Sequence, residues 1–292
     1  MKVNTLLMDM IRGQWLMSFE GLSVYAPFAH KLLSGEDVDM NSMTKSLMNV
    51  MDDNGRLLLP DENGNLDIPK GSVAIVDMIG PVMKYGDWCT YGADEIVRAL
   101  RSADNNPNII GTIFNVDSPG GAVSAIGPFV EFGKTKTKPV HGLLDQACSL
   151  GYWATLAVCD PGTIMADNDI SASIGSVGVV SSFVDNKEYL ESLGYKFHEI
   201  YADESEHKNE AFRLAREGKY DLIKAEHLSP LAQKFQGAVR NARLNLKEET
   251  GVLTGKVFGA EKALEYGMID SIGSLEKQVN LLHVKSELKH YN

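Results

Sequence analysis

The chain has 292 residues, which is enough for one domain of about 200 residues with appendages or for two small domains. Its 28 basic and 39 acidic residues give a formal net charge of −11. This charge argues against nucleic acid as a partner, because a protein that binds nucleic acid needs a basic face. The three cysteines, Cys89, Cys148 and Cys159, lack metal-ligand spacing, so we expect no metal, no cofactor and a reducing compartment.

Residues 1–70 are rich in methionine and amphipathic in places, and we interpret them as an N-terminal helical arm. The arm is either a solvated, partly ordered extension or a segment that packs on a neighbouring subunit. Its first residues are interrupted by Asp9 and Arg12, so they form neither the apolar core of a signal peptide nor a membrane span. We therefore expect a cytoplasmic protein with no membrane partner.

A regular alternation of short apolar runs and amphipathic segments begins at Ser72. Apolar runs bounded by glycine or proline predict buried strands, and apolar residues at helical spacing predict helices. Strands are expected at 73–79, 109–116, 140–144, 162–166, 177–181 and 196–201, and helices at 93–103, 122–132, 149–158 and 187–193. This order predicts an α/β fold with a mainly parallel sheet.

The pattern after residue 209 is mainly helical. A long helix is expected over 211–249, interrupted near Ser229 and Pro230, and its apolar face suits packing on the core or on another subunit. Residues 250–273 predict loop, short strand and short helix. The core therefore spans residues 71–275, and residues 276–292 form a C-terminal helix.

In an open α/β sheet the ligand site forms where the strands end. One predicted strand ends in Asp-Ser-Pro-Gly-Gly-Ala (117–122) and another in Asp-Gln-Ala-Cys-Ser (145–149). Together these turns offer a hydroxyl nucleophile, Ser149, and two backbone amides for an oxyanion, those of Gly121 and Leu150. Taken singly, Ser149 would by default be a helix N-cap, and Pro-Gly-Gly an ordinary turn.

Four groups of residues, in the same order, resemble motifs of the signal peptide peptidase A family of serine peptidases. They are Val-Asp-Ser-Pro-Gly-Gly (116–121), Ala-Cys-Ser-Leu-Gly-Tyr-Trp-Ala (147–154), Ile-Met-Ala-Asp (164–167) with Ser-Ile-Gly-Ser-Val-Gly-Val-Val (173–180), and the stretch 254–270. The resemblance covers residues 72–275. It implies a Clp protease/crotonase-like fold, a spiral of ββα units, and a serine–lysine dyad.

The resemblance also assigns roles to individual residues. Ser149 matches the nucleophile, although Leu150 replaces the usual first glycine, and Ser173 matches the serine that orients the lysine. The family's lysine best matches Lys208, in a loop that lacks the usual glycine and aspartate. A lysine acts as a base only if burial destabilises its ammonium, and acidic residues surround this one. Without the resemblance, Lys208 is an ordinary solvated lysine.

Two histidines compete with Lys208 for the role of base. His207 is adjacent and titrates in a suitable range, whereas His198 lies on a predicted apolar strand and is expected to be packed in the core. A Clp-type triad would need a histidine near Ile174, and that window has none.

Soluble relatives in phages and prophages resemble capsid-maturation proteases, and the stretch Gln-Trp-Leu-Met-Ser-Phe-Glu-Gly-Leu (14–22) resembles the segment before their core. The resemblance implies an endopeptidase that cuts extended scaffold or head proteins, forms homo-oligomeric rings or domes, and works in the host cytoplasm or the procapsid. Two alternatives within the fold are a soluble peptidase that degrades signal peptides or other proteins, and a catalytically silent capsid-assembly protein. A crotonase-type acyl-CoA enzyme is a third, although it would need neither Ser149 nor the 254–270 motif.

Overall fold

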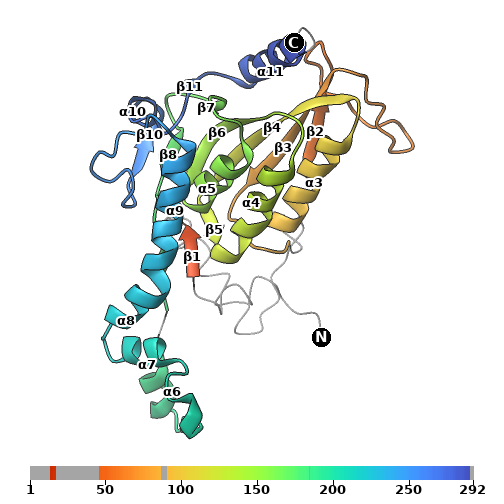
Figure 1. The fold of residues 1–292 in the computed structure, drawn as a ribbon. Helices are drawn as coiled ribbons and strands as arrows, with labels where there is room; N and C mark the ends of the chain where they lie inside the picture. Colours follow the sequence, from red (N-terminus) through yellow and green to blue (C-terminus); the bar gives the residue numbers. More distant parts are fainter. Residues whose placement is uncertain (1–13, 18–45, 87–90, 184, 290–292) are drawn as a thin grey trace.

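The computed structural model describes residues 14–17, 46–86, 91–183 and 185–289. Its body is an α/β structure with helices on both faces of a central sheet. A second helical region, residues 187–223, projects from the body (Figure 1) and is called the arm below; it is distinct from the predicted N-terminal helical arm. The strands are β1 (Gln14–Met17), β2 (Met48–Met51), β3 (Ser72–Ile79), β4 (Ile109–Ser118), β5 (Gly120–Ala122), β6 (Val140–Cys148), β7 (Ile164–Ala166), β8 (Ser173–Gly175), β9 (Val180–Ser181), β10 (Val257–Gly259) and β11 (Ser271–Ile272).

The helices are α3 (Ala93–Asn105), α4 (Ile126–Thr135), α5 (Leu150–Val158), α6 (Lys187–Ser192), α7 (Glu210–Arg216), α8 (Asp221–Ile223), α9 (Ser229–Ala242), α10 (Ala260–Glu265) and α11 (Leu275–Lys289). Helices α3 to α5 of the body alternate with strands, whereas α6 to α9 follow one another without an intervening strand. Short 3-10 helices span Val123–Ala125 and Asp203–Ser205, and a π-helical turn spans Lys224–Leu228.

The main sheet has the order β10-β8-β6-β4-β3-β2, with β7 beside β6 and β11 beside β7. The pairs among β3, β4, β6, β7, β8 and β11 are parallel, whereas β2 and β10 pair with their neighbours in the antiparallel sense. The predicted Clp protease/crotonase-like α/β fold with a mainly parallel sheet is thus confirmed. A second sheet, β5-β1-β9, lies at the lower end of the body in Figure 1.

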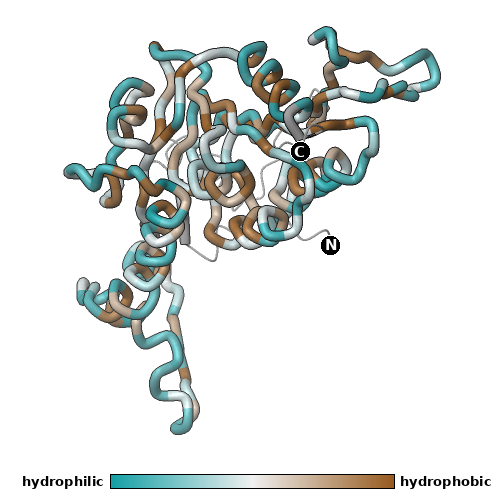
Figure 2. The backbone as a smooth tube through the Cα atoms, turned by 45° about the horizontal axis from the view of Figure 1, so that its top comes forward, coloured by the Kyte–Doolittle hydropathy of each residue, from teal (hydrophilic) through white to brown (hydrophobic). Residues whose placement is uncertain are grey.

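The two faces of the main sheet have separate hydrophobic cores. Helices α3, α4 and α5 cover one face, where Phe114, Phe129 and Leu144 are fully buried. Helix α11 covers the other face, and its Val279 and Leu282 pack against strand residues. Figure 2 shows the hydrophobic segments gathered in the strands and the adjoining helices. Burial of strands on both faces explains why they read as continuous apolar runs.

Three predictions about secondary structure need correction. The described residues of the predicted N-terminal helical arm include the strands β1 and β2, while residues 1–13 and 18–45 lie outside the description. Residues 196–201 form no strand, and His198 among them is exposed instead of packed in the core. The predicted helix 211–249 is broken at residues 217–220, and Pro230 lies in the first turn of α9, where proline is tolerated.

Candidate active site

Ser149 lies at a sharp turn between the end of β6 and the start of α5. Its backbone has φ 56° and ψ −118°, a left-handed conformation that is costly for a residue with a side chain. The Ser149 amide donates a hydrogen bond of 2.8 Å to the carbonyl oxygen of Gly175, and its carbonyl accepts one of 3.0 Å from the Trp153 amide. Strand-to-helix turns of this kind carry the nucleophile in other hydrolases, and here Ser149 is buried.

The Ser149 side chain does not cap α5, since no side-chain hydrogen bond closes the first turn of this helix. The helix-cap interpretation of Ser149 is therefore wrong. The first amides of a helix have no intrahelical acceptor, and they carry the positive end of the helix dipole. Leu150 supplies the first of these amides, and its role as an oxyanion donor stays a prediction.

Gly121, the other predicted oxyanion donor, lies in β5 against Val82. A Cβ atom at Gly121 would lie 1.9 Å from the Val82 carbonyl oxygen, so only glycine fits. The structure brings this turn beside Ser149. Ser118 pairs with Ala147, and a Cβ at Gly151, in the first turn of α5, would lie 3.0 Å from the Ser118 carbonyl oxygen.

Ser173, the predicted lysine-orienting residue, begins β8 next to the end of β6. It pairs with Gln146 on one side and with Gly259 of β10 on the other, and its carbonyl accepts a hydrogen bond from the Cys148 thiol. β10 belongs to the 254–270 motif and Ser118 to the 116–121 motif, so all four recognised motifs meet at this end of β6. The sequence did not predict β8 as a strand, nor that the Gly175 carbonyl would hold Ser149.

Three aspartates that the sequence did not single out lie near the carboxyl ends of neighbouring strands: Asp117 in β4, Asp145 in β6 and Asp167 after β7. Burial, followed by the charge of Asp145, raises the pKa of Asp117, and the same two causes raise the pKa of Asp167. Asp145 accepts a hydrogen bond of 2.9 Å from the Ser171 hydroxyl. In the sequence, each of these aspartates directly follows an apolar run, and this pattern could have identified them. Together they make the rim of the site acidic.

Lys208 lies on the arm, two residues before α7, and is exposed. Figure 1 shows α7 in the arm, away from α5 in the body, so this single chain does not bring Lys208 to Ser149. His207 is also exposed, and its ring lies 2.8 Å from the carboxylate of Glu210 and 3.3 Å from that of Glu206. The neighbouring carboxylates thus engage His207, and Lys208 has no ion pair with any residue that the structure describes.

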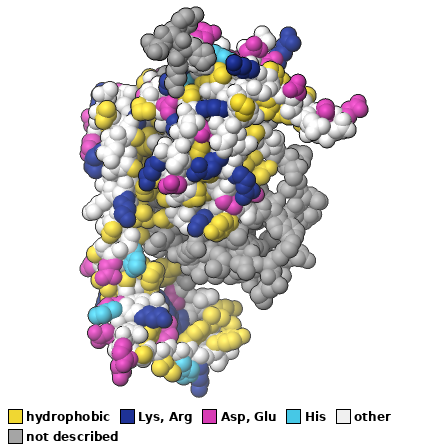
Figure 3. Space-filling view, turned by 45° about the vertical axis from the view of Figure 1, so that its right-hand side comes forward, with side chains coloured by type: hydrophobic (Ala, Val, Ile, Leu, Met, Phe, Trp, Pro, Cys, Tyr) yellow, Lys and Arg dark blue, Asp and Glu magenta, His cyan; other side chains and the backbone are white. Residues whose placement is uncertain are grey.

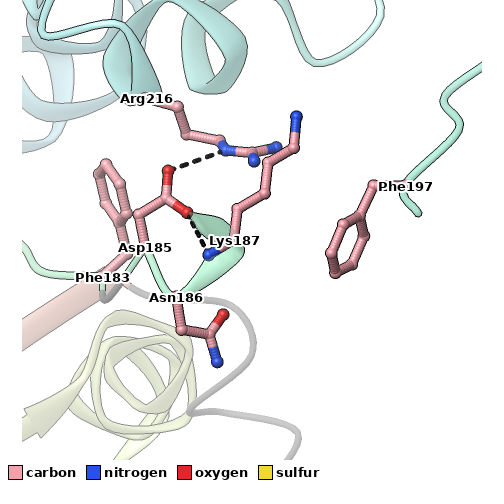
Figure 4. Close-up of a pocket in the computed structure, with 6 residues that line it drawn as sticks. All are labelled: Phe183, Asp185, Asn186, Lys187, Phe197 and Arg216. Carbon is pink, nitrogen blue, oxygen red and sulfur yellow. Dashed lines mark hydrogen bonds and ion pairs between the residues drawn. The ribbon is translucent and has the colours of Figure 1, made fainter. Parts of the chain in front are cut away.

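The arm also carries a cavity of about 250 Å³ between α6 and α7. Arg216 reaches across it to Asp185 at 3.2 Å, and Phe183 and Phe197 form apolar walls (Figure 4). Figure 3 shows hydrophobic side chains gathered on the outside of this arm. The exposed large apolar residues of this region are Val180, Phe183, Tyr189, Leu193, Tyr195, Phe197, Ile200, Phe212 and Tyr220.

The described part of the chain shows neither a metal-binding cluster nor a membrane-spanning helix. It contains no group of three or more histidine, cysteine, aspartate or glutamate side chains arranged to hold a metal ion. Within the same residues, every helix is too short or too polar to cross a membrane. Cys89 lies outside the described residues, whereas Cys148 and Cys159 are buried thiols.

Comparison with known proteins places this geometry in a family. The profile of Peptidase family S49 matches residues 133–289. Protease 4 of Haemophilus influenzae is 25% identical over 76% of this chain and 36% of its own length. The chloroplastic serine protease SPPA of Arabidopsis thaliana is 26% identical over 67% of this chain and 29% of its own length. The head-tail preconnector protein GP5 of Enterobacteria phage P21 is 26% identical over 65% of this chain and 38% of its own length.

The chain thus spans between 29% and 38% of the length of these three relatives. Among solved structures, a membrane-bound stomatin-specific protease, 1510-N, in complex with a substrate peptide aligns with a TM-score of 0.46 and 15% identity, covering 70% of this chain and 76% of that one. The S49 profile covers more than half of the chain, including Ser149 and the strands β6, β7, β8, β10 and β11. The chain belongs to Peptidase family S49, the family of signal peptide peptidase A.

Proposed function

We propose that this protein is a serine endopeptidase in which Ser149 attacks the substrate carbonyl and the amides of Gly121 and Leu150 stabilise the oxyanion. The observation that carries the proposal is the strained backbone of Ser149, with φ 56°, combined with a hydroxyl that does not cap α5. Strain persists where surrounding structure holds it, and it concentrates at functional sites. A serine with a purely structural role would adopt an ordinary cap conformation.

The base in this proposal is Lys208, supplied by a neighbouring subunit. The arm that carries it projects from the body and exposes large apolar side chains, including Tyr195 and Phe212. Exposed apolar patches of this kind mark protein interfaces. Packing of the arm on the body of another subunit would bury both the patch and the Lys208 ammonium, and burial favours the neutral amine that can accept the serine proton.

The substrates in this proposal are extended polypeptides, and phage or prophage scaffold and head proteins are the expected class. Similarity to the preconnector protein of phage P21 supports this setting. An assembled ring would admit unfolded segments and exclude folded proteins. The rim of Asp117, Asp145 and Asp167 would also disfavour acidic side chains near the cut.

The test is cleavage of casein by the assembled protein and by its Ser149→Ala and Lys208→Ala variants, with Lys219→Ala as a control on the same arm. Lys219 is an exposed lysine paired with Glu217 at 2.8 Å. We expect Ser149→Ala and Lys208→Ala each to lose at least 1,000-fold in rate, as for other nucleophile–base units, and Lys219→Ala to retain full activity. An equally fast Lys208→Ala variant would rule out Lys208 as the base.

Mixing the two inactive variants tests the origin of the base. If Ser149 and Lys208 act across a subunit interface, a mixed assembly of Ser149→Ala and Lys208→Ala subunits contains intact pairs and regains a fraction of wild-type activity. A mixture that remains inactive, although mass spectrometry shows mixed assemblies, would contradict a dyad between subunits.

The exposed position of Lys208 favours one second candidate, a catalytically silent assembly protein. A fluorophosphonate probe separates the two functions, because it labels only an activated serine. Labelling of wild type but not of Ser149→Ala supports the peptidase. Absence of labelling in every assembled state would support the silent protein.

A further inference from the structure

Strand β1 lies between β5 and β9 and is paired with both. It runs antiparallel to β5, with Trp15 opposite Ala122 and Met17 opposite Gly120. It also runs antiparallel to β9. Four residues from near the start of the chain are therefore held in extended form by main-chain edges on both sides (Figure 1). Proteins that recognise extended peptides hold them in this way, by adding the peptide to a sheet edge.

The register of β1 on β5 follows from the hydrogen bonds on the far side of β5. The Val82 amide donates to the Gly120 carbonyl at 2.9 Å, and the Ala122 amide donates to the Val82 carbonyl at 2.9 Å. Successive residues of a strand direct their N–H and C=O groups to opposite edges. The amide of Gly121 therefore faces β1, where Leu16 lies opposite it. The carbonyl of Leu16 is the acceptor that this amide meets.

The other edge of β1 agrees with this register. Trp15 lies opposite Val180 in β9, and it directs its backbone groups away from β5 because Leu16 directs its own toward β5. Neighbouring residues of β1 thus pair with different strands. The space between the edges of β5 and β9, which residues 14–17 fill, is called the groove below. The alternation fixes the position of residues 14–17 along this groove and the rotation of the segment about its own axis.

We propose that residues 14–17 occupy the substrate groove of the enzyme as its own first substrate, and that the bond cut is Leu16–Met17. The inference rests on the proposed function, in which Gly121 donates to the oxyanion. If the Gly121 amide binds the carbonyl that is attacked, the residue opposite Gly121 precedes the cut. That residue is Leu16.

The reaction is an ordinary peptide hydrolysis. The Ser149 hydroxyl attacks the Leu16 carbonyl carbon and transfers its proton to the base, and the oxyanion accepts hydrogen bonds from the Gly121 and Leu150 amides. The C–N bond to Met17 then breaks, and the base returns the proton to the Met17 amine. Water hydrolyses the Leu16 ester, which regenerates Ser149 and leaves a Leu16 carboxylate.

A groove that already holds residues 14–17 cannot hold another peptide in the same place. Because residues 14–16 belong to the same chain, they bind in the groove at a high effective concentration. Cleavage after Leu16 removes this advantage. The cut therefore precedes the turnover of other substrates. Full-length enzyme should show a lag with casein, and the lag should end as the new N-terminus at Met17 appears.

The experiment follows the N-terminus of the assembled full-length protein by intact mass and N-terminal sequencing, with casein cleavage measured in the same samples. Wild type is expected to lose residues 1–16, whereas Ser149→Ala keeps them. Leu16→Asp, which places a charge before the cut, should slow this cleavage at least tenfold. Leu59→Asp is the matched control, because Leu59 is 76% exposed in a loop outside the groove, and it should be cut like wild type.

A synthetic peptide with the sequence of residues 9–22 supplies the same segment to wild-type protein in trans. Cleavage between Leu16 and Met17 supports the register, and cleavage at any other bond overturns it. Casein cleavage by a chain that keeps residues 1–16 would overturn the inference and leave the proposed function standing. If neither casein, the peptide nor the chain is cut in any assembled state, both fail.

Discussion

The amide of Ser149 donates a hydrogen bond of 2.8 Å to the carbonyl oxygen of Gly175, and this bond ties the turn at the end of β6 to β8. Gly175 itself has φ 130°, and a Cβ atom there would lie 2.5 Å from the Lys256 carbonyl oxygen. The close packing of β8 against the segment before β10 therefore holds Gly175 in place. Through its hydrogen bond with the Ser149 amide, Gly175 holds Ser149 in its unfavourable backbone conformation with positive φ.

Removal of the Ser149 side chain should stabilise the protein if Ser149 is strained. Ser149→Gly relieves a strain of about 1–3 kcal/mol, against an entropic cost of about 0.4–1 kcal/mol for the added glycine. We expect Ser149→Gly to exceed Ser149→Ala in free energy of unfolding by about 1 kcal/mol. Urea denaturation of both variants measures the difference.

Ser173 provides the control for this comparison, because it lies in β8 and is not among the described non-glycine residues with positive φ. Here glycine should be less stable than alanine by about 0.5–1 kcal/mol. If glycine is the less stable substitution at both positions, Ser149 is not strained.

Gly121→Ala should abolish activity and weaken the fold, because the added methyl would lie 1.9 Å from the Val82 carbonyl oxygen. β5 has to move away from Val82, which displaces the Gly121 amide from the oxyanion. We expect at least a 100-fold loss of casein cleavage, as for removal of one oxyanion donor. The measurement is the rate at saturating casein together with the urea midpoint.

Gly127→Ala is the matched control, since Gly127 lies in α4 and a Cβ atom there meets nothing within 4 Å. Alanine in a helix is favoured over glycine by about 1 kcal/mol, so this variant should be at least as stable as wild type and fully active. Equal activity of the two variants would show that the Val82 contact does not position the Gly121 amide.

Asp117→Asn should stabilise the protein at neutral pH. Burial and then Asp145 raise the pKa of Asp117 in the folded state, so the folded protein holds this proton more tightly than the unfolded chain. Stability is then lost as pH rises from the unfolded pKa through the folded one, and the deficit persists above it. The variant should have a higher urea midpoint than wild type at pH 7, and the gain should vanish at pH 3.

Asp61→Asn is the control of opposite sign. The Asn65 amide is the main cause that lowers the pKa of Asp61, so this carboxylate contributes stability that is present above the unfolded pKa and lost as pH falls through the folded one. Asp61→Asn should therefore lower the midpoint at pH 7. Matching shifts in the two variants would contradict the electrostatic origin of both.

Much of the body could be predicted from the sequence because its strands are buried on both faces. The apolar runs that became β3, β4 and β6 start within one residue of the predicted positions, and α5 ends where predicted. Such runs are long enough to be distinctive, and glycine or proline bounds several of them. Ser149, the proposed nucleophile, was found by the same reasoning, since it directly follows one of these strands.

Other features depend on partners that a local pattern does not reveal. Residues 196–201 alternate like a strand, but no strand lies beside them among the described residues, and all except Tyr201 are exposed. Conversely, β8 has three residues and too little pattern to be recognised, yet pairing with β6 and β10 makes it a strand. The position of Lys208 relative to Ser149 likewise depends on which subunit supplies the arm.

The pair formed by Arg243 and Asp270 anchors the C-terminal motif to the sheet that carries Ser149. The guanidinium donates two hydrogen bonds, of 2.7 and 3.0 Å, to the Asp270 carboxylate, and its Nε donates to the Gly267 carbonyl at 2.8 Å. Asp270 also accepts a hydrogen bond of 2.9 Å from the Ile164 amide at the start of β7. The sequence analysis did not identify Arg243, which is buried.

Asp270→Ala should therefore be strongly destabilising, because it leaves the charge of a buried guanidinium without its carboxylate partner and the Ile164 amide without its side-chain acceptor. We expect a loss of about 3 kcal/mol in the free energy of unfolding, in the range for breaking a buried ion pair. Glu248→Ala breaks the exposed pair of Glu248 with Arg240, whose side chains are 51% and 47% exposed, and should cost at most about 1 kcal/mol. Urea denaturation compares the two variants, and equal losses would show that Asp270 is no more than a surface partner. Because Asp270 joins the C-terminal motif to β7, its loss should also slow casein cleavage, whereas the Glu248 variant should retain the wild-type rate.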